Sequence, residues 1–98
     1  FMTSKQLFDN ISIRTSRYVT RKYSTSFSLG ILCLKKELRD PVYALYGWVR
    51  FADEIVDTFH DYDKKSLLER FTADTYRAIE EGISLNPILN AFQYTVKK

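Results

Sequence analysis

The 98-residue sequence has little of what disulfide-linked or metal-clamped small folds need: it contains one cysteine, one histidine, three glycines and two prolines. A single cysteine, Cys33, cannot form an intrachain disulfide, and it excludes a zinc site built from several cysteines. A reducing, cytoplasmic compartment is the simpler expectation. Because glycine and proline punctuate turns, their scarcity favours long helices over a sheet of many short strands.

Long apolar runs and a strong excess of one charge are also missing. No stretch approaches the roughly 20 apolar residues of a bilayer-spanning helix, and the first residues lack a secretory apolar segment. The net charge of +3 is too weak for a tail that binds nucleic acid through phosphate contacts alone. With 45% apolar residues, the chain is expected to pack as one soluble helical unit, 1–98, without an internal domain boundary.

The spacing of apolar residues and breakers predicts an all-α chain. Helices are expected over 4–22, about 36–58, 64–81 and from 87 onward, with a hydroxyl-rich loop feeding a short helix between 23 and 34. Pro41 should lie in the first turn of its helix, where a missing N–H is tolerated.

A basic cluster lies near the end of the first predicted helix. It consists of Arg14, Arg17, Arg21 and Lys22. A solvated helix face is the ordinary interpretation of such a cluster, and contact with a diphosphate or with an anionic membrane surface are the alternatives. We therefore expect a cytoplasmic protein that can also contact a membrane peripherally.

Segment 42–57 is apolar or aromatic at eleven of its sixteen positions and yet carries four charges. At about 100° per residue, Arg50, Asp53 and Asp57 fall on one side of a helix together with Tyr46. A helix that is apolar nearly all round is normally buried in a larger assembly, where unpaired charges are costly. We therefore expect its polar stripe to line a site.

Asp53 and Asp57 are one helical turn apart, so their carboxylates repel each other unless a cation lies between them. Mg²⁺ suits carboxylate oxygens, keeps several waters and often completes its shell with substrate phosphates; Mn²⁺ is an alternative ion. Arg50 could contact the same phosphates. An ion pair between Arg50 and Asp53 or Asp57 on a solvated stripe is the alternative that spacing alone leaves open.

The segment Tyr23-Ser-Thr-Ser-Phe-Ser-Leu-Gly, followed by Ala44-Leu-Tyr-Gly-Trp-Val-Arg-Phe-Ala-Asp-Glu-Ile-Val-Asp57, resembles the opening of phytoene and squalene synthases, and of phytoene synthases most. These enzymes condense prenyl diphosphates head to head. The resemblance implies the N-terminal part of an isoprenoid (terpenoid) synthase helical fold, in which two aspartate motifs face each other across a cavity.

The resemblance also implies roles for individual residues. Asp53 and Asp57 match the first aspartate motif, which holds Mg²⁺ against the substrate diphosphate, and Arg50 contacts the same anion. Two further pairs are implied: Ser24 and Ser26 as diphosphate or entrance residues, and Phe27 and Tyr46 as residues facing the hydrocarbon or the cation. Helix capping is the alternative for the serines.

No opposing aspartate motif follows Asp57, because Asp61 and Asp63 fall in the connection after the helix and Asp74 stands alone. The chain is therefore expected to be the N-terminal portion of a longer enzyme that needs its C-terminal part and is inactive alone. The implied reaction converts two geranylgeranyl diphosphates to phytoene. Squalene synthase-type condensation of farnesyl diphosphate and a non-catalytic helical interaction module are the alternatives.

Overall fold

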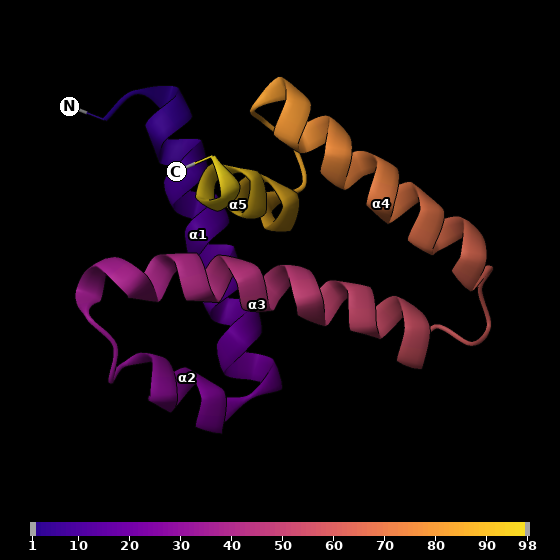
Figure 1. Ribbon diagram of the computed structural model, residues 1–98, viewed down its shortest axis with the longest axis horizontal. Helices are drawn as coiled ribbons and strands as arrows, with labels where there is room; N and C mark the ends of the chain where they lie inside the picture. The colour runs from indigo at the N-terminus through magenta and orange to yellow at the C-terminus, as the bar shows by residue number, and fades with distance from the viewer. Residues whose placement is uncertain (1, 98) are drawn as a thin grey trace.

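The computed structural model describes residues 2–97 and confirms the all-α prediction, since this part of the chain forms helices and no strand (Figure 1). No helix within it is long and apolar enough to cross a bilayer. The helices are α1 (Ser4–Tyr23), α2 (Thr25–Ile31), α3 (Lys36–Asp57), α4 (Lys64–Glu81) and α5 (Pro87–Val96).

The later helix ends follow local signals that the sequence carries. The Asp63 carboxylate accepts a hydrogen bond from the Ser66 N–H at 3.1 Å and caps α4. Gly82, with φ of 75°, ends α4 in the left-handed conformation that favours glycine. The Asn86 side chain caps α5, whose first residue is Pro87. These predicted boundaries are confirmed.

Two predicted details at the start of α2 and α3 are wrong. Ser24 alone separates α1 from α2, so the hydroxyl-rich run expected as a loop is the capped first turn of α2. α3 begins at Lys36, in agreement with the predicted start of about 36, but Pro41 then lies in the second turn of the helix and not in the first. Pro41 cannot donate the bond that the carbonyl of Glu37 would receive in a regular helix, and the helix continues past it.

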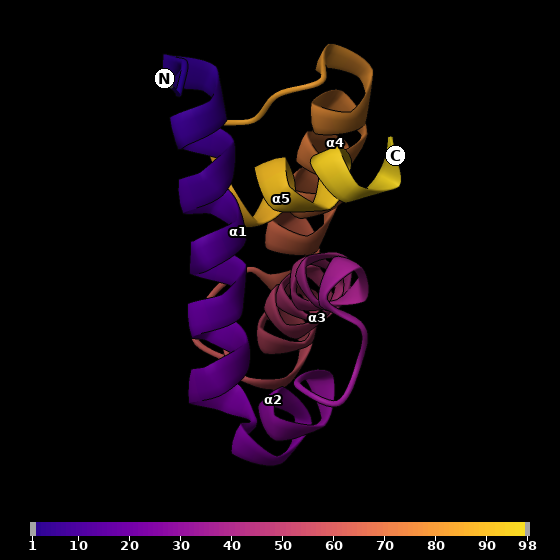
Figure 2. The ribbon, with the colours of Figure 1, turned by 90° about the vertical axis from the view of Figure 1, so that its left-hand side faces the viewer.

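The core forms where α1 crosses α3 and α5 fills the angle between them (Figures 1 and 2). Ile13 of α1, Ala44 of α3 and Ala91 of α5 form a buried cluster. Small residues let α1 and α3 approach closely: a Cβ added to Gly47 would lie 3.3 Å from the Ser16 Oγ.

Trp48 joins α3 to the two helices that follow it. Its indole N–H donates to the Thr75 hydroxyl of α4 at 3.1 Å. The same ring stacks on Phe92 of α5, with centroids 4.8 Å apart, and lies tilted against Phe71 at 5.9 Å. This aromatic group settles which side of α3 faces the core.

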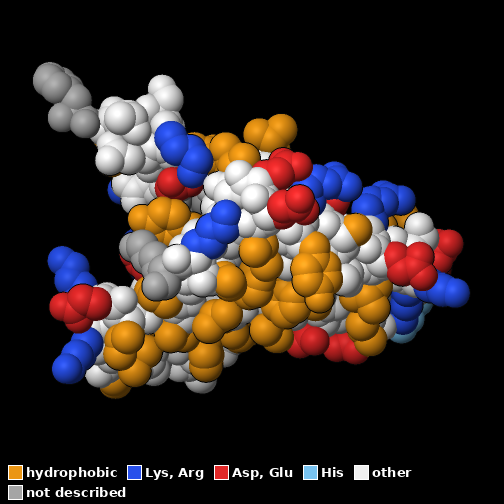
Figure 3. Space-filling model, turned by 45° about the horizontal axis from the view of Figure 1, so that its top comes forward, with side chains coloured by type: hydrophobic (Ala, Val, Ile, Leu, Met, Phe, Trp, Pro, Cys, Tyr) orange, Lys and Arg blue, Asp and Glu red, His pale blue; other side chains and the backbone are white. Residues whose placement is uncertain are grey.

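The opposite side of α3 is open in the part of the chain that the structure describes. Leu45, Val49 and Val56 are 45%, 46% and 51% exposed. Apolar side chains also gather on the molecular surface in Figure 3, which shows a broad hydrophobic band bordered by charged groups. Because α1 and α5 cover only one side of α3, the described residues include nothing that covers the other.

Candidate functional site

Asp53 and Asp57 lie in the last two turns of α3, and both are exposed. Neither carboxylate forms a hydrogen bond or ion pair with another residue in the described part of the chain. The ammonium of Lys64 is close to this helix end, but it donates to the carbonyl of Val56 at 2.6 Å. Two unpaired carboxylates one turn apart therefore present a local negative surface that attracts a cation.

The chemistry of these donors fits Mg²⁺. Carboxylate oxygens are its preferred protein ligands, and it commonly uses one or two of them together with waters and substrate phosphates. Among residues 2–97, no group of three or more His, Cys, Asp or Glu side chains is placed to hold a metal by itself. The pair could accordingly supply part of a coordination shell and leave the remainder to water and an anionic ligand.

Arg50 does not pair with either aspartate. Its Nη2 donates to the Glu54 Oε1 at 3.0 Å, and its guanidinium carbon lies 5.0 Å from the centre of the Tyr23 ring. The spacing of Arg50 and Glu54, four residues apart, permits this pair, but the sequence reasoning considered only Asp53 and Asp57 as partners. Glu54 and Tyr23 are therefore residues of this region that sequence reasoning missed.

The two predicted aromatic residues meet next to Arg50. Phe27 of α2 stacks on Tyr46 of α3, with ring centroids 4.9 Å apart and planes at 25°. Phe27 keeps 44% of its surface exposed, so the pair offers an accessible aromatic face. Such a face can stabilise a nearby positive charge.

The two serines behave differently from each other. The Ser24 hydroxyl accepts a hydrogen bond from the Phe27 N–H at 3.1 Å, which makes Ser24 the cap of α2. Ser26 is exposed in the first turn of the same helix. The helix-capping interpretation therefore describes Ser24, and Ser24 places Phe27 at the start of α2.

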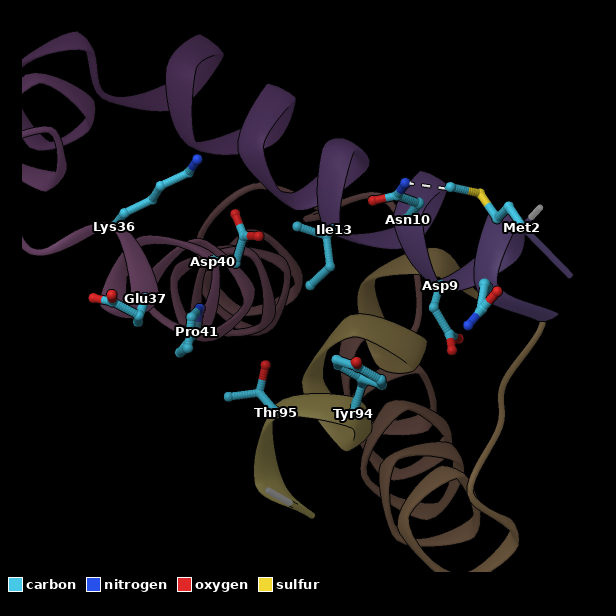
Figure 4. Close-up of a pocket in the computed structure, with 11 residues that line it drawn as sticks. Met2, Asp9, Asn10, Ile13, Lys36, Glu37, Asp40, Pro41, Tyr94 and Thr95 are labelled. Atoms are coloured by element: carbon cyan, nitrogen blue, oxygen red, sulfur yellow. Dashed lines mark hydrogen bonds between the residues drawn. The ribbon is translucent and has the colours of Figure 1, made fainter.

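A separate cleft of about 780 Å³ lies at the other end of α3 (Figure 4). Asp9 of α1, Asp40 of α3 and Tyr94 of α5 contribute to its lining. Asp53 lies thirteen residues after Asp40 along the helix, a distance of about 20 Å at 1.5 Å per residue. Two of the carboxylates of this cleft are already engaged, since Asp9 pairs with Lys5 and Asp40 with Arg17. The cleft is distinct from the aspartate pair.

Comparisons with known proteins give a consistent result. Residues 20–98 match the family described as squalene/phytoene synthase. A 15-cis-phytoene synthase of Synechococcus elongatus is 39% identical over 41 residues, 42% of this chain and 13% of that protein. Phytoene synthase 1, chloroplastic, of Zea mays is 29% identical over 75 residues, 67% of this chain and 18% of that protein. The chain thus spans less than a fifth of these relatives, and no solved structure gives a significant match.

Proposed function

Because the chain belongs to the squalene/phytoene synthase family, we propose that it supplies the first aspartate motif of a prenyltransferase that condenses two geranylgeranyl diphosphates to phytoene. The fold class agrees with this assignment, since an all-α chain of this family is part of the isoprenoid synthase fold. Both relatives named above carry the name phytoene synthase, which favours a C20 substrate and a role in carotenoid biosynthesis.

The observation that carries the proposal is the unpaired state of Asp53 and Asp57 beside a cation and an aromatic pair. The two carboxylates would hold Mg²⁺, which when bound neutralises negative charge on a departing diphosphate. Arg50 would contact the same anion through guanidinium N–H groups that Glu54 does not use.

The aromatic residues would act on the other half of the ionised substrate. When the C–O bond breaks, the diphosphate leaves with the electron pair and an allylic carbocation remains. The faces of Phe27 and Tyr46 are suited to stabilise that charge while the double bond of the second prenyl chain attacks. Loss of a proton then gives a cyclopropylcarbinyl diphosphate, whose own ionisation and rearrangement lead to the linear product.

The 98 residues hold only this half of the proposed site. In our proposal, further helices of a longer polypeptide cover the open side of α3 and bring a second aspartate motif opposite the first. The share of the relatives that the chain spans supports this, as does the exposure of Leu45, Val49 and Val56 beside the carboxylates.

The test is turnover of geranylgeranyl diphosphate by the full-length protein and by its Asp53→Ala and Asp57→Ala variants. Each variant should lose at least about 100-fold in turnover, because charge stabilisation at the leaving group is removed, and should lose its dependence on Mg²⁺. Asp61→Ala is the control, since Asp61 is an exposed carboxylate outside α3 and should keep wild-type turnover. The 98-residue chain alone should be inactive.

Three results would change the proposal. Unchanged turnover in Asp53→Ala or Asp57→Ala would contradict the metal assignment. Faster turnover of farnesyl than of geranylgeranyl diphosphate would favour the squalene synthase-type alternative. No turnover of either substrate by the full-length protein would favour a non-catalytic helical module.

We also propose that the outer face of α1 makes peripheral contact with an anionic membrane. Leu7, Ile11 and Tyr18 are 52%, 47% and 61% exposed. At about 100° per residue they share one side of the helix with basic side chains of the cluster predicted from the sequence. Each cation near an anionic bilayer contributes about 1 kcal/mol to binding.

A further inference from the structure

Arg50 is held from two directions at the junction of α1, α2 and α3. On its own helix, the Glu54 carboxylate accepts from its Nη2 at 3.0 Å. From the end of α1, the Tyr23 ring lies 5.0 Å from the guanidinium carbon. The side chains of Arg50 and Glu54 are only 23% and 18% exposed, so their pair lies largely out of water.

Fold stability is a weak explanation for this pair. A pair with the basic residue N-terminal to the acidic one is the less favourable order on a helix, and exposed pairs of this spacing contribute little. Moving both charges out of water is costly and offsets their attraction. The Nε of Arg50 is also buried without a hydrogen-bond partner, which adds a further cost. The fold therefore gains little from the ion pair of Arg50 with Glu54.

The pair has a clear effect on the neighbouring carboxylates. Arg50 lies three residues before Asp53, a spacing at which arginine and aspartate side chains reach each other on a helix. In the described structure Arg50 pairs with Glu54, and Asp53 and Asp57 keep all their oxygens free of ion pairs. Glu54 thus serves as the local counter-ion that Asp53 would otherwise provide.

Resting on the function proposed above, we infer that Glu54 is a positioning residue: its carboxylate holds the Arg50 guanidinium on the Tyr23 ring and off Asp53, leaving the aspartate pair free to bind a divalent cation. Without the charge of Glu54, Arg50 turns to Asp53. The cation then has to displace a guanidinium before it binds, and Arg50 loses its place on the Tyr23 ring.

The test measures Mn²⁺ binding directly, by electron paramagnetic resonance, to the full-length protein in the presence of inorganic diphosphate. Glu54→Gln is nearly isosteric and removes the charge, and it should weaken Mn²⁺ binding roughly tenfold, the scale of one charge-assisted hydrogen bond. Glu54→Asp keeps the charge and should restore part of the loss. Tyr23→Phe keeps the ring and should bind Mn²⁺ like the wild type, whereas Tyr23→Leu should bind more weakly.

A double-mutant cycle separates positioning from a direct effect of the Glu54 charge on the ion. If Glu54 acts through Arg50, then Glu54→Gln should change Mn²⁺ binding little when Arg50 is already replaced in Arg50→Gln. An equal loss in both backgrounds overturns the inference, and so does unchanged binding in Glu54→Gln. A wild-type protein that binds no Mn²⁺ with diphosphate overturns the proposed function and this inference with it.

Discussion

Gly47→Ala tests whether the close contact of α1 and α3 is built as the structure describes it. Gly47 lies in the middle of α3 and is buried where that helix packs against α1. An added Cβ would lie 3.3 Å from the Cδ1 of Ile88 and 3.3 Å from the Oγ of Ser16. The substitution therefore sets a favourable backbone effect against a steric one.

The two effects have comparable size, and burial decides between them. Replacing glycine by alanine inside a helix gains about 1 kcal/mol of stability. Ile88 and Ser16 are 1% and 0% exposed, so neither can move into solvent to admit the methyl group, and overpacking of this kind costs about 1–3 kcal/mol. We expect a net loss of about 1 kcal/mol, which lowers the melting temperature of a domain of this size by about 4–8 °C.

The assay is thermal and urea unfolding followed by circular dichroism, with Gly30→Ala as the matched control. Gly30 lies in α2, and an added Cβ there meets no atom within 4 Å, so only the helix-propensity gain remains. Gly30→Ala should therefore stabilise the chain while Gly47→Ala destabilises it. Stabilisation by both substitutions to the same extent would refute the described approach of α1 to α3.

Two further predictions concern α1. Burial raises the pKa of the Asp9 carboxyl, but hydrogen bonds from Lys5 and Asn90 and the charge of Lys5 lower it more, leaving it below its ordinary value of 3.8. Folding thus favours the ionised carboxylate. The stability that Asp9 contributes to the fold is present above pH 3.8 and is lost as the pH falls through the pKa of the folded state. The Asp9→Asn variant should therefore lose less of its urea resistance than the wild type between about pH 6 and pH 2. The outer face of α1 predicts that the full-length protein sediments with vesicles of phosphatidylcholine and phosphatidylserine. The Ile11→Asp variant should sediment with them less. Equal sedimentation of the wild type and the variant would contradict the proposed membrane contact.

The helix boundaries that could be predicted from the sequence are those marked by local chemistry. Asp63, Gly82 and Asn86 each act through a hydrogen bond or a backbone conformation within a few residues, so the residue type is enough to place the end. The start of α3 has no such mark, since Lys35 makes no side-chain capping bond. The predicted start at about 36 nevertheless matches Lys36, and the error concerns Pro41, which lies in the second turn of the helix and not in the first.

The partner of Arg50 could not be chosen from spacing alone. Asp53 and Glu54 lie three and four residues after it, and both distances allow contact on a helix. Tyr23 restricts the choice, because its ring comes from α1 and packs against the guanidinium. That contact depends on how α1 crosses α3, a tertiary feature that the linear pattern does not contain.

The unfavourable features of α3 gather on one side of the helix, which is the strongest physical argument for a binding face there. The negative charge of Asp57, in the last turn, is repelled by the negative end of the helix dipole, which typically costs about 0.3–1 kcal/mol of stability. Its repulsion with Asp53 adds about 0.2–0.5 kcal/mol. On the same side, Val49 and Val56 leave about half of their surface in water. A helix selected only for stability would place lysine and glutamine at these positions, so their charge and exposure are best explained by ligands and protein segments that this face binds.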